Sequence, residues 1–248
     1  MSIITDDLHL KLLSKRPILV GKIPIYPVSI DDISMLGYEN YSHKLSFICM
    51  EKDWVLNQVK QITDDENVMT LEVFDFIFSI LQQDIKLREE ITTLFSLIFR
   101  AKVEFIDELQ LIKVNDAYIN NMNFSEIQDI IRKRNNILSH TEVDDNPEND
   151  KARQLLEKRK KNREKLNRVR SNDSNGLNLG DLVSIFAGGM KLPIETVMEY
   201  DLYQFNDQFS RLSIMKDYDV NIEALIHGAK SEDVKLEHWM RKINKEDK

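Results

Sequence analysis

The feature that most constrains the fold of this chain is a run of basic residues near its middle. Between Lys151 and Arg170, ten of the twenty residues are Lys or Arg and only Glu157 and Glu164 oppose them, so the run has a net charge of +8. Only five of its residues are apolar. A helix of this composition can bury very little of its surface. The run therefore predicts a charged, solvated helical connector between two parts of the chain.

Length and composition favour helices on both sides of this connector. A chain of 248 residues can form one large or two small domains, and a hydrophobic fraction of 42% supplies a core. Strand-rich folds use Gly and Pro in turns, whereas this chain has only seven Gly and five Pro. We predict a mainly α-helical protein with a mostly helical N-terminal domain over residues 1–140, a charged helical connector over 141–176 and a small helical C-terminal domain over 177–248.

Local patterns place the expected elements. β-prone residues broken by Gly21 and Pro24 predict a small hairpin near residues 18–25, and alternation over 103–114 predicts a second one, both in the N-terminal domain. Apolar spacing and capping residues predict helices over 29–50 (with a break at Gly37), 73–81, 86–102, 124–135, 179–188, 193–200, 202–215, 218–228 and 235–243. The nearly continuous apolar stretch 73–81 should be the most buried of these helices.

Residues that usually carry catalysis or hold metals are sparse and scattered. The five His make no paired-ligand spacing, and the single Cys, Cys49, allows neither an internal disulfide nor a zinc finger. Glycine-rich nucleotide-binding motifs and the GxSxG turn of hydrolases do not occur. Acidic pairs such as Asp31-Asp32 suit helix starts better than acid–base chemistry. We therefore expect no enzyme activity, no cofactor and no metal site.

The chain does not predict a membrane span or a signal peptide. No apolar run reaches the roughly 18 residues of a transmembrane helix. The first residues contain an early acidic pair and lack a basic region followed by an apolar core. A single cysteine fits a reducing compartment. We expect a cytoplasmic protein without a membrane partner.

A helix-turn-helix is one possible route to nucleic-acid binding. Residues 182–205 have the small-residue turn and the apolar spacing of such a motif. The second helix would read DNA, but it carries Glu195 and Glu199 and no Lys or Arg. A helix in the major groove faces phosphates on both sides, which would repel these carboxylates. We do not favour DNA recognition by this element.

The basic connector is the better nucleic-acid candidate. Its most concentrated charges are Lys158, Arg159, Lys160 and Lys161. No aromatic residue alternates with them to stack on bases, and the charges spread around the helix instead of collecting on one face. A solvated connector, a contact with the acidic residues 142–150 and a contact with an acidic partner all remain open.

Four short landmarks follow one another in the C-terminal part of the chain: Leu202-Tyr203-Gln204-Phe205, Tyr218-Asp219, His227-Gly228-Ala229 and His238-Trp239. In this order they resemble the landmarks of tail-module proteins of tailed phages and prophages of Gram-positive bacteria. Residues 23–53 are similar to the opening of such proteins as well. These landmarks are packing and turn residues rather than reactive ones.

The resemblance implies a tail assembly chaperone that works in the host cytoplasm. Such proteins coat the long tape-measure protein and recruit tail tube subunits, so these phage tail proteins are the expected partners. A homo-oligomer is left open. The alternatives are a structural tail or baseplate component retained in the virion, and a nucleic-acid-binding regulator that uses the basic connector.

Five large side chains of the C-terminal domain are the candidate partner-binding residues: Tyr203, Phe205, Phe209, Met215 and Trp239. A helical domain can offer a groove to the apolar stripe of a helical partner. We expect Phe205 and Phe209 to lie mainly in the core. Tyr203 and Trp239 should be partly exposed, because one end of each side chain is polar.

Overall fold

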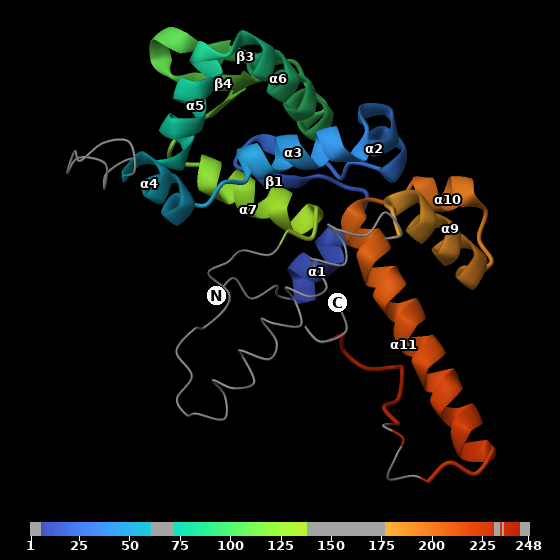
Figure 1. Ribbon diagram of the computed structural model, residues 1–248. Helices are drawn as coiled ribbons and strands as arrows, with labels where there is room; N and C mark the ends of the chain where they lie inside the picture. The colour runs from blue at the N-terminus through green and yellow to red at the C-terminus, as the bar shows by residue number, and fades with distance from the viewer. Residues whose placement is uncertain (1–5, 61–71, 138–176, 231–233, 235, 244–248) are drawn as a thin grey trace.

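The computed structural model describes residues 6–60, 72–137, 177–230, 234 and 236–243 (Figure 1). The predicted connector over 141–176, with Lys158, Arg159, Lys160 and Lys161, lies outside the described residues. The division into domains 1–140 and 177–248 stays a prediction.

Helices dominate the described part of the chain, which contains ten α-helices and two small antiparallel sheets. The N-terminal part contains α1 (Asp6–Leu12), β1 (Ile18–Val20), β2 (Ile23–Ile25), α2 (Ile30–Leu36), α3 (Tyr38–Ile48), α4 (Lys52–Lys60), α5 (Val73–Gln83), α6 (Ile85–Phe99), β3 (Val103–Ile106), the 3₁₀ helix η2 (Asp107–Leu109), β4 (Leu111–Val114), β5 (Ala117–Ile119) and α7 (Phe124–Arg134). The C-terminal part contains α9 (Leu179–Met190), α10 (Ile194–Met198) and α11 (Leu202–Ile226). The predicted fold class, mainly α with small β-hairpins, is confirmed.

Both predicted hairpins are present. β1 pairs antiparallel with β2, and Gly21 between them has a φ of 59°, a left-handed conformation that glycine adopts without steric cost. β3 pairs antiparallel with β4. A third strand, β5, extends this second sheet by pairing with β4. The sequence pattern missed β5 because three residues are too few to establish an alternation.

The apolar faces predicted for the central helices meet in a common core. The buried residues of α5 are Phe74, Ile77, Phe78 and Leu81, those of α6 include Ile91, Leu94, Phe95 and Ile98, and those of α7 include Phe124, Ile127, Ile130 and Ile131. Spacings of three and four residues put each set on one side of its helix. The stretch 73–81 is deeply buried, but the prediction that it is the most buried helix is wrong, because α5 has four buried residues and α7 has six over the same length of 11 residues.

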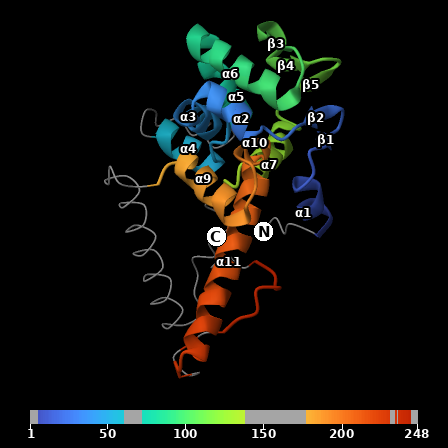
Figure 2. The same ribbon diagram turned by 90° about the vertical axis from the view of Figure 1, so that its right-hand side faces the viewer.

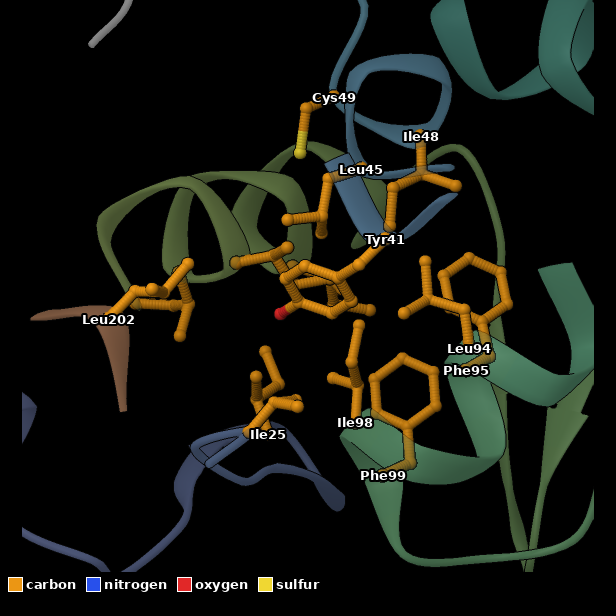
Figure 3. Close-up of a cluster of buried hydrophobic side chains, with 14 of the residues drawn as sticks. Ile25, Tyr41, Leu45, Ile48, Cys49, Leu94, Phe95, Ile98, Phe99 and Leu202 are labelled. Atoms are coloured by element: carbon orange, nitrogen blue, oxygen red, sulfur yellow. The ribbon is translucent and has the colours of Figure 1, made fainter. Parts of the chain in front are cut away.

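The C-terminal helices pack on the same core. Phe186 from α9, Val197 from α10 and Leu202 from α11 belong to one buried cluster with the N-terminal helices. Figure 3 shows Leu202 in the cluster that holds Tyr41 and Phe99. Within the described residues, the two ends of the chain therefore share one continuous core.

α11 is a single helix of 25 residues, although the sequence predicted separate helices over 202–215 and 218–228. No Gly or Pro interrupts residues 202–226, so the polar Asp217-Tyr218-Asp219 stretch does not end the helix. The helix ends just before Gly228, whose φ is 93°. The predicted C-terminal glycine is confirmed.

The helix predicted over 235–243 is wrong. Its described residues, 236–243, form bends and irregular backbone. Leu236, expected on the apolar face of the helix, is 45% exposed and does not reach a core, and Met240 is 68% exposed. A helix this short is not stable in water without such packing.

A buried ion pair joins three segments that are far apart in the sequence. The side chains of Arg134, at the end of α7, and Asp201, just before α11, are 3% and 2% exposed. Nη1 of Arg134 donates to Oδ2 of Asp201 (3.3 Å) and to the carbonyl oxygens of Leu12 (2.9 Å) and Ser14 (3.0 Å). Nη2 donates to the carbonyl oxygen of Arg16 (2.8 Å). We call these five residues the arginine latch.

The carboxylate of Asp201 serves two elements at once. Oδ1 accepts a hydrogen bond from the backbone N–H of Gln204 (2.7 Å) and so caps α11, while Oδ2 faces Arg134. Burial raises the pKa of Asp201 to about 6, because loss of hydration disfavours the carboxylate more than Gln204 and Arg134 favour it. Burial also lowers the pKa of Arg134. Breaking the pair would leave an unpaired charge in the interior.

Further contacts surround the latch, and one of them brings in α2. The N–H of Ile30 donates to the carbonyl of Tyr200 (2.8 Å). Nε2 of Gln204 donates to the carbonyl of Leu13 (2.8 Å). At the surface, Lys15 pairs with Glu199 (2.7 Å).

Replacing Arg134 with Met should lower the free energy of unfolding by about 3–5 kcal/mol, because Asp201 then stays buried without a counterion. Urea denaturation followed by circular dichroism measures the loss. Lys15→Ala is the matched control, since it breaks an exposed ion pair between two of the three segments and should leave the urea midpoint nearly unchanged. Equal midpoints for the two variants would contradict the structural importance of the latch.

Replacing Asp201 with Asn removes the titration of this carboxyl group. Because its pKa rises from 3.8 to about 6 on folding, the folded state binds more protons between these values. The stabilising contribution of the group is therefore largest below about pH 4 and is lost as the pH rises to about 6. Relative to Asp201→Asn, the wild-type protein should lose stability between pH 4 and 6 in urea denaturation. If the free energies of unfolding of the two proteins changed in parallel between pH 4 and 6, the pKa of Asp201 would not be raised.

Candidate partner-binding surface

α11 is the element that reaches farthest from the shared core. With 25 residues it is about 37 Å long. Its first turns pack against the core through Leu202, Phe205 and Leu212. Figures 1 and 2 both show its C-terminal half extending away from the other described helices. A long helix that is anchored at one end presents its other end to solvent.

Two of the five predicted partner-binding residues are buried and offer no surface to a partner. Phe205 is 2% exposed, and its expected core position is confirmed. Tyr203 is 5% exposed, so the prediction that it is partly exposed is wrong. Its hydroxyl lies 2.7 Å from Nδ1 of His9, which satisfies the polar end of the side chain inside the protein. Burial raises the pKa of Tyr203 to about 12.

Phe209 lies at the border of the core. Its side chain is half-buried, and its ring centroid is 5.7 Å from that of Phe205 and 6.3 Å from that of Phe186. The three rings pack α9 against α11. Phe209 therefore belongs mainly to the contact between these helices, as expected.

Met215 and Trp239 are the predicted partner-binding residues that reach the surface. Met215 is half-buried on the outer part of α11. Trp239 is half-buried in the irregular C-terminal segment and stacks on His238, with ring centroids 6.0 Å apart. Their role in partner binding stays a prediction.

An apolar stripe continues from Met215 along the outer half of α11. We define the stripe as Met215, Tyr218, Ile222, Leu225 and Ile226, whose spacings of three, four, three and one keep them on one side of the helix. Four of these side chains are half-buried, and Ile226 is 75% exposed. The sequence analysis missed Ile222, Leu225 and Ile226 as surface candidates because it placed them on a separate short helix.

Acidic side chains border the stripe. Asp219 and Glu223 are exposed and follow the stripe on the side of Ile226. Lys216 and Asp217 are exposed on the same half of the helix, so the four charged residues sum to −2. A partner with basic residues beside its apolar face would suit this border.

The C-terminal segment runs back toward α11. We call residues 236–243 the strap. The guanidinium of Arg211 donates to the carbonyl of Arg241, and the ring of Tyr218 lies 5.3 Å from that of His238. Arg211 precedes Met215 by four residues, so both contacts lie on the side of α11 that carries the stripe.

A cavity of 570 Å³ lies between α3, the start of α4 and the end of α7, and Leu202 at the start of α11 also lines it. Tyr38, Phe47 and Trp54 contribute aromatic walls. The thiol of Cys49 lines it too, but burial raises its pKa to about 12. A thiol that stays protonated is a poor nucleophile, so the cavity has no evident reactive group at this position.

No cluster of three His, Cys, Asp or Glu side chains in the described part of the chain is arranged to hold a metal ion. Among the same residues, no helix has the length and apolar character needed to cross a membrane.

Core and surface positions on α11 should respond differently to truncation. Phe205→Ala should lower the free energy of unfolding by about 3–5 kcal/mol, because it leaves a cavity in the core. Ile226→Ala removes a mostly exposed side chain and should change the free energy of unfolding by less than about 0.5 kcal/mol. Urea denaturation of both variants measures the difference. A large loss for Ile226→Ala would mean that the stripe is part of the folded core.

One comparison with known proteins gives a match, and it covers the C-terminal part of the chain. No curated protein and no solved structure matches the chain. Residues 167–244, which are 78 of 248 residues, match the family model described as the YomV second domain. The matched stretch contains α9, α10, α11 and the strap. This family is phage-derived, so the C-terminal part of the chain is similar to a phage domain, as expected for a phage protein.

Proposed function

We propose that this protein is a non-enzymatic tail assembly chaperone of a tailed phage, and that it binds the tape-measure protein, the tail tube protein or both. The observation that carries the proposal is the apolar stripe on the outer half of α11. The phage-derived character of the matched domain supports it. The action takes place in the host cytoplasm, before tail proteins assemble.

The stripe has the dimensions of a helix-binding surface. From Met215 to Ile226 it is about 17 Å long, the length of about three helical turns. A helical partner with apolar residues every three or four positions packs along such a ridge. The apolar contact is small, and a small contact suits a chaperone because the partner must later be released.

A structural tail or baseplate protein is the second candidate, because the same stripe would serve a permanent contact. The two candidates differ in their fate. A chaperone is absent from purified virions, whereas a structural component is present in them. Mass spectrometry of purified particles decides between the two.

Nucleic-acid binding is the weaker alternative. α10, the possible reading helix, has five residues and carries Glu195, with Glu199 directly after it. Steep loss of DNA affinity with salt, abolished by replacing Lys158, Arg159, Lys160 and Lys161 with Ala, would favour the basic connector as a nucleic-acid site instead.

Co-expression with the tape-measure protein of the same phage tests the proposal. The full-length chain should keep the tape measure soluble and co-purify with it. Ile222→Asp should abolish co-purification, because it places a charge in the centre of the stripe. Val220→Asp is the matched control: Val220 is 62% exposed on another side of α11, so its replacement should have no effect.

Circular dichroism first establishes that both Asp variants are folded. If Ile222→Asp still co-purified with the tape measure, the stripe would not be the binding surface. Failure of the wild-type protein to hold any tail protein would refute the chaperone function.

A further inference from the structure

The strap lies where a partner helix would dock. We propose that the stripe of α11 is the docking surface for an amphipathic helix with Lys or Arg beside its apolar face, and that the strap covers part of this surface until that helix displaces it. Only the assignment of the helix to the tape measure rests on the proposed function. The surface and the chemistry of its ligand stand on their own.

The contacts of the strap lie on the inner part of the stripe. Arg211 and Tyr218 each hold one strap residue, Arg241 and His238, and Met215 lies between them on the same side of α11. A helix that follows the stripe from Met215 outward would meet the strap at Tyr218. The two cannot occupy this part of the stripe together.

The strap covers less of the stripe than such a helix would, and it has no regular secondary structure. None of its described residues is in a helix or a strand, and the N–H of Arg241 donates to the nearby carbonyl of Trp239 (3.0 Å). Trp239 stacks on His238 rather than entering the core, and Met240 is 68% exposed. A helix that covers the whole stripe, including Ile226, buries more apolar surface than the strap does.

The acidic border of the stripe indicates the chemistry of the ligand. The strap combines an aromatic side chain, Trp239, with basic Arg241, which pairs with Glu237 inside the strap (3.2 Å). The acidic border of the stripe, Asp219 and Glu223, is complementary to a helix that carries positive charge. A ligand with an apolar face and a basic edge therefore competes for the same place.

Displacement of the strap can be followed through Trp239. The chain has two Trp, Trp54 and Trp239, so the full-length Trp54→Phe variant has Trp239 as its only tryptophan. The probe is a synthetic 20-residue helical peptide with a leucine stripe bordered by lysines. Saturating peptide should shift the Trp239 emission to longer wavelength, while a peptide with glutamates in place of the lysines should not. Binding of the lysine peptide without a shift would overturn the proposal.

Affinity gives the second test. A fluorescein-labelled lysine peptide should bind the full-length double variant His238→Ala/Trp239→Ala about tenfold more tightly than the wild type. In the wild type the strap occupies the site, and only the fraction of molecules with an open site can bind, so the apparent affinity is lower by that fraction. Ile222→Asp should abolish binding and Val220→Asp should not. Equal affinity of the double variant and the wild type would overturn the role of the strap.

Sedimentation of the double variant without peptide separates a helix partner from a second copy. A monomer is expected. If the double variant dimerises and Ile222→Asp prevents this, the stripe is a self-association surface and the proposal of a partner helix is overturned.

The inference and the proposed function can fail separately. If the peptide displaces the strap but the tape measure is not bound, the inference stands and the proposed function fails. If the tape measure is bound through the stripe while Trp239 does not respond, the inference fails alone.

Discussion

The structure depends on the burial of one guanidinium group, that of Arg134. Arginine keeps its charge, so a guanidinium can enter the interior only when acceptors surround it. Here the acceptors are three main-chain carbonyls of the segment 12–16 and the carboxylate of Asp201. If any of the three segments moved away, the charge would lose its compensation. The N-terminal segment, α7 and α11 are therefore obliged to pack together.

This constraint also explains how α11 can project from the core. Asp201 caps the first turn of the helix and faces Arg134, so the position and direction of α11 are set at its N-terminal end. Phe205 and Phe209 then fix the inner half against Phe186. The outer half does not have to be held by the core, and its apolar side chains are available for the strap or for a partner.

Much of the fold follows from local sequence patterns, but the key contacts do not. The apolar spacing in residues 73–99 and 124–134, and the capping residues Ser29 and Asp201, predict the helices because these signals act over a few residues. Arg134 stands in the basic last turn of its helix, where an arginine is usually solvated. Three of its partners are backbone carbonyls more than a hundred residues away, which no residue type encodes, and the fourth is Asp201, which is 67 residues away. The missed surface stripe has a similar cause, since it depends on α11 being continuous.

The latch also sets the order in which the chain can reach its final structure during synthesis. Leu12 and Arg134 are separated by 122 residues. At typical synthesis rates the acceptors in the N-terminal segment leave the ribosome roughly 6–24 s before the arginine that they bind. Asp201 follows 67 residues after Arg134. Until Asp201 is synthesised, the guanidinium of Arg134 has only the carbonyls of the N-terminal segment as acceptors, and α7 cannot bury its last side chain beside a carboxylate. The final closure of the molecule is thus tied to the synthesis of its C-terminal part.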